Sequence, residues 1–207
     1  MLKSLIYNLF ILSGLLFAVN GQNMAPSAKD LIRIQDKELG ISFVKSGAVK
    51  QIDNTTYNIS LTSSESGTSN NAIAEVSVSN RLYVDLPGSY GGRLYLDSPN
   101  AGKLIQNIVE ADTVIINQQS YKREYWVVYA GMGMWDCVIN CYAKRDGKYY
   151  MVSFIQDRQI GKPGEIIESK QLNSGDLKLQ ALSFLKDDTN NSISEYYKLL
   201  SSFQIQK

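Results

Sequence analysis

The sequence predicts an α+β fold in which an antiparallel β-meander sheet is covered by a C-terminal amphipathic helix and one or two shorter helices. The first observation is the stretch 122–157, which is rich in β-branched and aromatic residues and has reversals at 131–133 and 146–147. The second is the Asp-Gly pair at the later reversal, because this pair supplies the positive φ values of a tight hairpin turn. The third is a run of apolar residues at helical spacing near the C-terminus: Ile193, Tyr196, Tyr197, Leu200 and Phe203.

Residues 1–21 have the layout of a secretory signal peptide. Lys3 gives a short basic region, residues 5–19 are mostly apolar, and small residues precede a cleavage site that leaves Gln22 as the new N-terminus. The apolar run falls short of the roughly 20 residues that a membrane-spanning helix needs, so we expect cleavage rather than an anchor. We therefore expect a secreted or periplasmic protein with no membrane span after cleavage.

The rest of the chain is expected to be a flexible polar leader, 22–30, followed by a single α+β domain, 31–207. Alternating apolar residues predict short strands in this domain at four places: 31–34, 40–44, 48–52 and 56–62. A short helix beginning at Ser27 is an alternative for the first of them.

A second group of elements precedes the meander. Residues 63–71 form a Ser/Gly/Asn-rich loop, and 72–78 are a strand or one helical turn. The segment 81–96 contains a glycine-rich turn. Residues 102–111 read as a short helix with its apolar residues on one stripe, and 113–117 as a strand.

After the meander, the polar excursion 161–175 leads to an apolar element at 177–185, either helix or strand. Ser192 and Glu195 then match a capping box, in which each side chain bonds an exposed amide of the first helical turn. The helical pattern places Leu200 and Phe203 in the core and Ser202 off the apolar stripe.

The two cysteines, Cys137 and Cys141, lie in the second strand of the meander. Residues four apart in a strand face the same side, but they lie roughly 13 Å apart. A disulfide needs Cα atoms about 5.5–6 Å apart, so we predict buried free thiols on an apolar face with Ile139 and Ala143. A helix or tight loop here would instead allow a bond.

The composition excludes several classes of function. The chain has 21 basic and 20 acidic residues, and loss of Lys3 with the signal peptide leaves 20 of each, so no nucleic-acid partner is indicated. The chain has 0 histidines, which removes the commonest general base and the commonest zinc ligand. We therefore expect no catalysis, no cofactor and no metal site.

The order of these features resembles the PsbP/DcrB-like α/β/α sandwich superfamily. The resemblance rests on Leu-Gly-Ile-Ser-Phe at 39–43, on the meander ending Lys-Tyr-Tyr-Met-Val-Ser-Phe at 148–154, and on Glu-Tyr-Tyr-Lys-Leu-Leu-Ser-Ser-Phe at 195–203. The Pro-x-x-Trp pattern that often follows the first strand in that family is absent, since Lys-Ser-Gly-Ala stands at 45–48. The resemblance implies a non-enzymatic, extracytoplasmic accessory or binding domain and transfers no functional residues.

The candidate binding surface is the sheet face opposite the two cysteines. Strict alternation places Val138, Asn140 and Tyr142 there, beside Val127 of the preceding strand, and it predicts five candidate binding residues: Tyr125, Tyr129, Tyr142, Tyr149 and Met151. This face is too aromatic for an ordinary solvated surface. Either a second layer covers it, or it recognises a partner through tyrosines, which combine a large contact area with a polar group.

These observations predict a domain that binds another exported protein as an accessory, inhibitor or immunity-type protein. A carbohydrate- or small-ligand-binding module that uses the tyrosine face is the second expectation. The third is a histidine-free hydrolase that uses paired carboxylates, such as Glu165 with Glu168 or Asp187 with Asp188. A deep pocket with converging acids would favour the hydrolase, and an exposed flat tyrosine patch would favour the binding domain.

Overall fold

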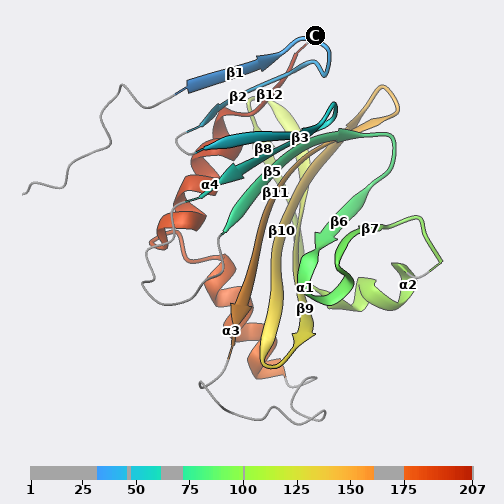
Figure 1. Cartoon of the computed structure of the whole chain (residues 1–207), viewed down its shortest axis with the longest axis vertical. Coiled ribbons are helices and arrows are strands. Elements are labelled where there is room, and N and C mark those ends of the chain that lie inside the picture. The colour runs from blue at the N-terminus through green and yellow to red at the C-terminus, as the bar shows by residue number, and fades with distance from the viewer. Residues whose placement is uncertain (1–31, 46–47, 62–71, 100, 161–174, 207) are drawn as a thin grey trace, which may run out of the picture. The chain divides into compact units, whose positions relative to one another are not determined.

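A computed structural model of the chain describes residues 32–45, 48–61, 72–99, 101–160 and 175–206 (Figure 1). Several predicted features lie outside the described residues: the predicted signal peptide, the predicted leader, the alternative helix at Ser27, the loop 63–71, nearly all of the excursion 161–175 and the Glu165/Glu168 pair. No helix in the described part of the chain is long and apolar enough to cross a bilayer.

Seven antiparallel strands form the main sheet, in the order β3-β4-β5-β11-β10-β9-β8. Their bounds are β3 Val49–Asp53, β4 Thr56–Ser60, β5 Ile73–Ser79, β8 Ile108–Ile116, β9 Gln119–Gly131, β10 Met134–Arg145 and β11 Lys148–Gln159. A three-stranded sheet contains β1 (Ile32–Asp36), β2 (Ile41–Lys45) and β12 (Gln204–Ile205), and a separate hairpin contains β6 (Tyr83–Leu86) and β7 (Gly92–Tyr95). The helices are α1 (Pro87–Tyr90), α2 (Ala101–Leu104), α3 (Gly175–Leu185) and α4 (Asn191–Ser202). The predicted α+β class and meander are confirmed.

The later reversal of the meander is the expected tight turn. Asp146 has φ 51° and Gly147 has φ 76°, and Arg145 pairs with Lys148 across the turn. Two successive positive φ values match the right-handed twist of the flanking strands, which is why Asp-Gly is favoured here.

The earlier reversal sets the register of β9 against β10, and it contains a β-bulge. Met134 pairs with Gly131, but the register shifts by one residue beyond it, so that Cys137 pairs with Val127. Without the shift, Cys137 would pair with Val128. Because side chains alternate along a strand, a shift of one residue moves every side chain of β9 to the other face relative to β10.

Because of this bulge, two of the predicted binding tyrosines lie on the other face of the sheet. Ile139 pairs with Tyr125, and Trp135 pairs with Tyr129, so both tyrosines share the face of the two cysteines. The expectation that Tyr125 and Tyr129 lie opposite the cysteines, as strict alternation through an ordinary turn requires, is therefore wrong.

One face of the main sheet packs on α3 and α4, and we call it the helix face (Figure 1). Its core combines Cys137 and Cys141 with Tyr196 of α4 and Leu185 of α3, all buried. Tyr196 also donates a hydrogen bond of 3.0 Å from its hydroxyl to the carbonyl of Val152 on β11. The predicted cover by the C-terminal helix is thus confirmed.

The opposite face, which we call the hairpin face, packs on β6, α1 and β7. We call residues 83–95 the β6–β7 segment. The apolar contact joins Val84, Leu86 and Leu94 of this segment to Trp126 and Val138 of the sheet. Of the two alternatives for this face, a second layer therefore covers its central part.

Two helix boundaries differ from the sequence prediction. Asn190, rather than Ser192, is the N-cap of α4, and its Oδ1 accepts a hydrogen bond of 3.0 Å from the Ser192 amide. Asn is among the strongest N-cap residues, so the helix begins two residues earlier than the capping-box pattern suggests. The helix expected over 102–111 ends early, because Ile108 is already paired with Trp126 in the sheet. Tertiary pairing outweighs local propensity there.

Both cysteines are free and buried, as predicted. Burial raises the pKa of Cys137 and of Cys141 to about 12. Because the thiolate is the reactive form, its fraction at neutral pH is on the order of a thousandfold smaller than for an ordinary cysteine of pKa about 8.5. We expect both thiols to react with a thiol-specific dye at ordinary rates in denaturant and to be protected in the native protein. Rapid titration of two thiols in native buffer would contradict this.

Candidate functional site

The structure divides the five predicted binding residues between the two faces of the sheet. Tyr142, Tyr149 and Met151 share the hairpin face, because Tyr142 pairs with Met151 across β10 and β11. Met151 is 1% exposed and belongs to the core. The two half-buried tyrosines, Tyr142 and Tyr149, are therefore the part of the predicted site that the structure brings together at a surface.

The other two residues have structural roles on the helix face. Tyr125 is 2% exposed, and its hydroxyl lies 3.3 Å from the hydroxyl of Tyr197 on α4. Tyr129 packs edge-on against Trp135, with 5.2 Å between the ring centroids. Neither residue contributes to the surface that contains Tyr142 and Tyr149.

Tyr142 and Tyr149 form an edge-to-face pair with ring centroids 6.3 Å apart and an interplanar angle of 67°. Two exposed lysines approach the pair. Lys122 Nζ lies 5.9 Å from the centroid of Tyr142, and Lys144 Nζ lies 5.1 Å from that of Tyr149. Both distances allow a cation–π attraction. We call these four residues the tyrosine platform.

The buried carboxylate of Glu124 fixes the orientation of Tyr142 in the platform. Glu124 is 2% exposed, and it accepts hydrogen bonds of 3.0 Å from the Tyr142 hydroxyl and 3.2 Å from Trp126 Nε1. It also forms an ion pair of 2.7 Å with Lys122. Burial and the charge of Glu124 raise the pKa of Tyr142 to about 12, so its phenol stays protonated and keeps donating. The Tyr142 ring is therefore held in one orientation.

Sequence reasoning missed the lysines and Glu124, although the signal for them was present. Lys122, Glu124 and Trp126 alternate along β9, so they share one face, and that face is identified once the bulge is known. On β10, Lys144 follows Tyr142 at the same spacing.

A second group of buried polar residues attaches the β6–β7 segment to the hairpin face. Glu75 of β5 is 3% exposed, accepts a hydrogen bond of 2.6 Å from the Tyr83 hydroxyl, and lies 3.4 Å from Arg93 Nη2. Asn140 Nδ2 donates a bond of 3.0 Å to the carbonyl of Tyr83. These partners satisfy polar groups that would otherwise be costly to bury.

Asp136 makes the third attachment, to α1. Its carboxylate is fully buried and accepts hydrogen bonds of 2.9 Å from the Gly88 amide and 2.7 Å from the Ser89 amide, and another from the Ser89 hydroxyl. Asp157 lies directly across the β10–β11 ladder from Asp136. Burial and the hydrogen bond to Asp136 raise the pKa of Asp157 to about 7.

These acids do not form a metal centre, because no group of three metal-ligating side chains gathers within the described ranges. The expected Asp187/Asp188 pair does not resemble an acid–base pair either. Asp187 Oδ1 accepts hydrogen bonds of 3.0 Å from the Thr189 amide and 2.6 Å from its hydroxyl, and these bonds lower the pKa of Asp187. Asp187 thus closes the turn before α4.

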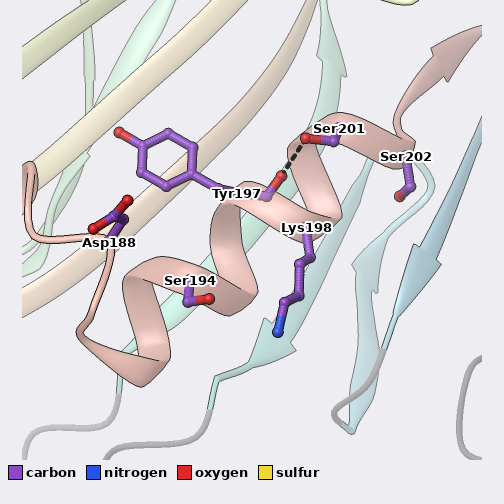
Figure 2. Close-up of a pocket in the computed structure, with 6 residues that line it drawn as sticks. All are labelled: Asp188, Ser194, Tyr197, Lys198, Ser201 and Ser202. Carbon is purple, nitrogen blue, oxygen red and sulfur yellow. Dashed lines mark hydrogen bonds between the residues drawn. The ribbon is translucent and has the colours of Figure 1, made fainter. Parts of the chain in front are cut away.

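A hollow of about 530 Å³ lies along the outer side of α4 (Figure 2), and Figure 2 shows Tyr197 and Asp188 at one end of it. It is lined by Asp188, Ser194, Tyr197, Lys198, Ser201 and Ser202. The Ser201 hydroxyl donates a hydrogen bond of 2.7 Å to the Tyr197 carbonyl, within the helix itself. The hollow is wide, and its lining has one carboxylate, that of Asp188, so it is not the deep acidic pocket that would favour a hydrolase.

A second hollow, of about 340 Å³, lies where the β8–β9 turn meets the C-terminal segment. Its lining includes Asn117, Arg145 and Phe203. Asn117 Nδ2 donates hydrogen bonds of 3.1 Å and 2.8 Å to the carbonyls of Ser201 and Phe203, so this side chain joins the turn to the end of α4. Neither hollow includes a residue of the tyrosine platform.

No family model and no curated protein matches this chain. The structure is similar to the Ran-binding protein Mog1p of Saccharomyces cerevisiae, with a TM-score of 0.38 and 8% identity over 84% of this chain and 95% of that one. It is also similar to cyanobacterial PsbP (CyanoP) from Synechocystis, with a TM-score of 0.33 and 14% identity over 92% and 98% of the two chains. No residue role, ligand or partner transfers at these identities and TM-scores.

Proposed function

We propose that this protein is a non-enzymatic, secreted or periplasmic binding domain that recognises another extracytoplasmic protein through the tyrosine platform. The proposal is supported by one observation above all. Two half-buried tyrosines lie together on a rigid sheet, fixed by the buried carboxylate of Glu124. Because their orientation is set in advance, little side-chain entropy is lost when a partner binds. The extracytoplasmic location rests on the signal peptide predicted at 1–21.

The charge of the platform indicates the chemistry of the partner. Lys122 is paired with Glu124, and Lys144 adds a second cation beside Tyr149, so the platform has a net positive charge. A partner segment with carboxylates around an apolar centre is complementary to this surface. Opposite charges at the rim of an interface raise the association rate and select the partner, whereas buried aromatic residues supply most of the affinity.

The test is capture from the native envelope or medium by the immobilised protein and by a Tyr142→Ser/Tyr149→Ser variant. Truncating a hot-spot residue of an interface costs at least about 2 kcal/mol, and tyrosines are frequent hot spots, so we expect the variant to bind its partner about thirtyfold more weakly or worse. The matched control is Tyr90→Ser, because Tyr90 is 49% exposed and lies outside the platform. Equal capture by the double variant and the control, with unchanged thermal unfolding in both, would contradict the proposal.

A carbohydrate-binding function is the second candidate, and it uses the same two rings. The lysine ammonium groups near both rings favour a sugar with carboxylate or sulfate groups over a neutral one. Competition separates the candidates. An anionic oligosaccharide that displaces the captured protein at micromolar concentration supports the sugar, and displacement only by the partner's own acidic segment supports the protein.

A further inference from the structure

The β6–β7 segment meets the sheet through a pair of acids at one place. Asp136 on β10 and Asp157 on β11 are cross-strand neighbours on the hairpin face, and α1 closes over them. A Cβ atom at Gly88 would lie 2.9 Å from Oδ1 of Asp136 and 3.3 Å from Oδ1 of Asp157. The backbone of α1 is therefore in contact distance of both carboxyl groups.

Two carboxyl groups this close cannot both be ionised at low cost, and this pair, with Asp136 buried and Asp157 half-buried, holds one proton between them. The carboxylate of Asp136 accepts three hydrogen bonds from Gly88 and Ser89 and therefore acts as the acceptor of the pair. Asp157 is then the member that keeps the proton and donates it to Asp136.

We propose that the Asp136–Asp157 pair makes attachment of the β6–β7 segment dependent on pH. While the pair holds its shared proton, the segment stays on the hairpin face. When Asp157 loses that proton to solvent, two adjacent negative charges remain beneath α1, and the segment detaches more often. The proposal concerns the hairpin face alone and does not depend on the proposed binding function.

The direction of the pH dependence follows from the pKa of Asp157 in the attached state and in the detached state. Burial, with the hydrogen bond and charge of Asp136, raises the pKa of Asp157 to about 7 in the attached state. Detachment exposes Asp157 to water but leaves Asp136 beside it on the ladder, so the pKa of Asp157 falls toward the value of about 4 for a solvated aspartate. The stabilisation is therefore complete below the pKa of the detached state and is lost as the pH rises through about 7. Over that range the ratio of attached to detached states falls up to about tenfold for each pH unit.

The other charged groups around the pair shift the pKa values of their neighbours, and the direction of each shift can be stated. Asp85 of β6 has its pKa raised to about 6, first by burial and then by the charge of Glu75 on β5, so it also loses a proton as the pH rises. Arg93 of β7 opposes that shift. Arg158, next along β11, lowers the pKa of the Cys137 thiol on the helix face. Beyond these groups, α1 contributes the exposed Tyr90, and β9 contributes the apolar Ala130.

The experiment measures backbone amide exchange of Gly88 and Ser89 between pH 5 and pH 7, expressed as protection factors. This normalisation removes the intrinsic pH dependence of exchange. We expect both factors to fall at least about tenfold over this range, while those of Cys141 and Val152 in the centre of the sheet stay constant. Asp157→Asn keeps a donor toward Asp136 but has no proton to lose at this position, so its factors at Gly88 and Ser89 should fall less than those of the natural protein, and only by the share that Asp85 contributes.

Protection factors of Gly88 and Ser89 that stay constant with pH in the natural protein would overturn the proposal. A fall of these factors in Asp157→Asn equal to that in the natural protein would also overturn it. An equal fall at Cys141 and Val152 would also overturn it, because the whole sheet would then be opening. If Asp157→Asn does not fold, carboxyl-carbon titration of the natural protein decides the matter. A titration above pH 6 for the pair supports the proposal, and two titrations near pH 4 overturn it.

Discussion

The Phe203→Ala protein is expected to unfold with a free energy about 3–5 kcal/mol below that of the natural protein. Phe203 is the C-cap residue of α4, is fully buried, and packs edge-on against Tyr121 with ring centroids 6.2 Å apart. Truncation leaves a cavity where the end of α4 meets β9. Since small domains hold only about 5–15 kcal/mol in total, the urea midpoint should fall sharply.

The control for this variant is Lys198→Ala, on the exposed side of the same helix. We expect a change within about 0.5 kcal/mol there. Ser202 is not a suitable control, although the helical pattern places it off the apolar stripe. Its hydroxyl accepts a hydrogen bond of 2.8 Å from the Val44 amide and donates one of 2.7 Å to the Leu199 carbonyl. Small, equal losses in Phe203→Ala and Lys198→Ala would mean that α4 adds little to the core.

The Gly88→Ala protein should lose about 1–3 kcal/mol, the usual cost of inserting a methyl group where no space exists. A Cβ atom at Gly88 would lie 2.8 Å from Cβ of Ala130 and 2.9 Å from Oδ1 of Asp136, and neither neighbour is the flexible end of a side chain. The α1 turn must then move away from the sheet, and its hydrogen bonds to Asp136 lengthen.

Gly102→Ala in α2 is the matched control, since a Cβ atom there meets nothing within 4 Å. Alanine is favoured over glycine inside a helix, so this substitution should be neutral or slightly stabilising. Thermal unfolding of the two proteins side by side makes the comparison. Similar thermal unfolding midpoints for the two proteins would show that the β6–β7 segment accommodates the added methyl group at no cost, which contradicts the packing described for it.

The sequence was most informative about features that neighbouring residues determine. The Asp146-Gly147 turn, the strands of the meander and the apolar stripe of α4 all arise from local patterns, and the structure contains each of them. The free state of Cys137 and Cys141 followed from the same strand assignment.

The candidate site was less predictable, because it depends on a single inserted residue. The bulge beside Met134 has no distinctive sequence, yet it moves Tyr125 and Tyr129 to the helix face. Long-range contacts were also inaccessible. The attachment of Tyr83 to Glu75 and of Ser89 to Asp136 joins residues whose pairing no periodicity encodes. The four residues of the tyrosine platform could therefore be grouped only when the register of β9 against β10 was known.

The pairing of β12 with β2 has a consequence for the order in which the chain folds. Gln206 donates a hydrogen bond of 2.7 Å to the Gly40 carbonyl, so residues at opposite ends of the domain complete one small sheet. Synthesis proceeds at about 5–20 residues per second, so β2 waits on the order of ten seconds for its last partner. During that time the β2 edge and the buried side chains of Ile41 and Phe43 have no α4 to pack against. A chaperone that holds unfolded chains would meet this N-terminal hairpin as an open edge, and final closure must follow release of the C-terminal residues.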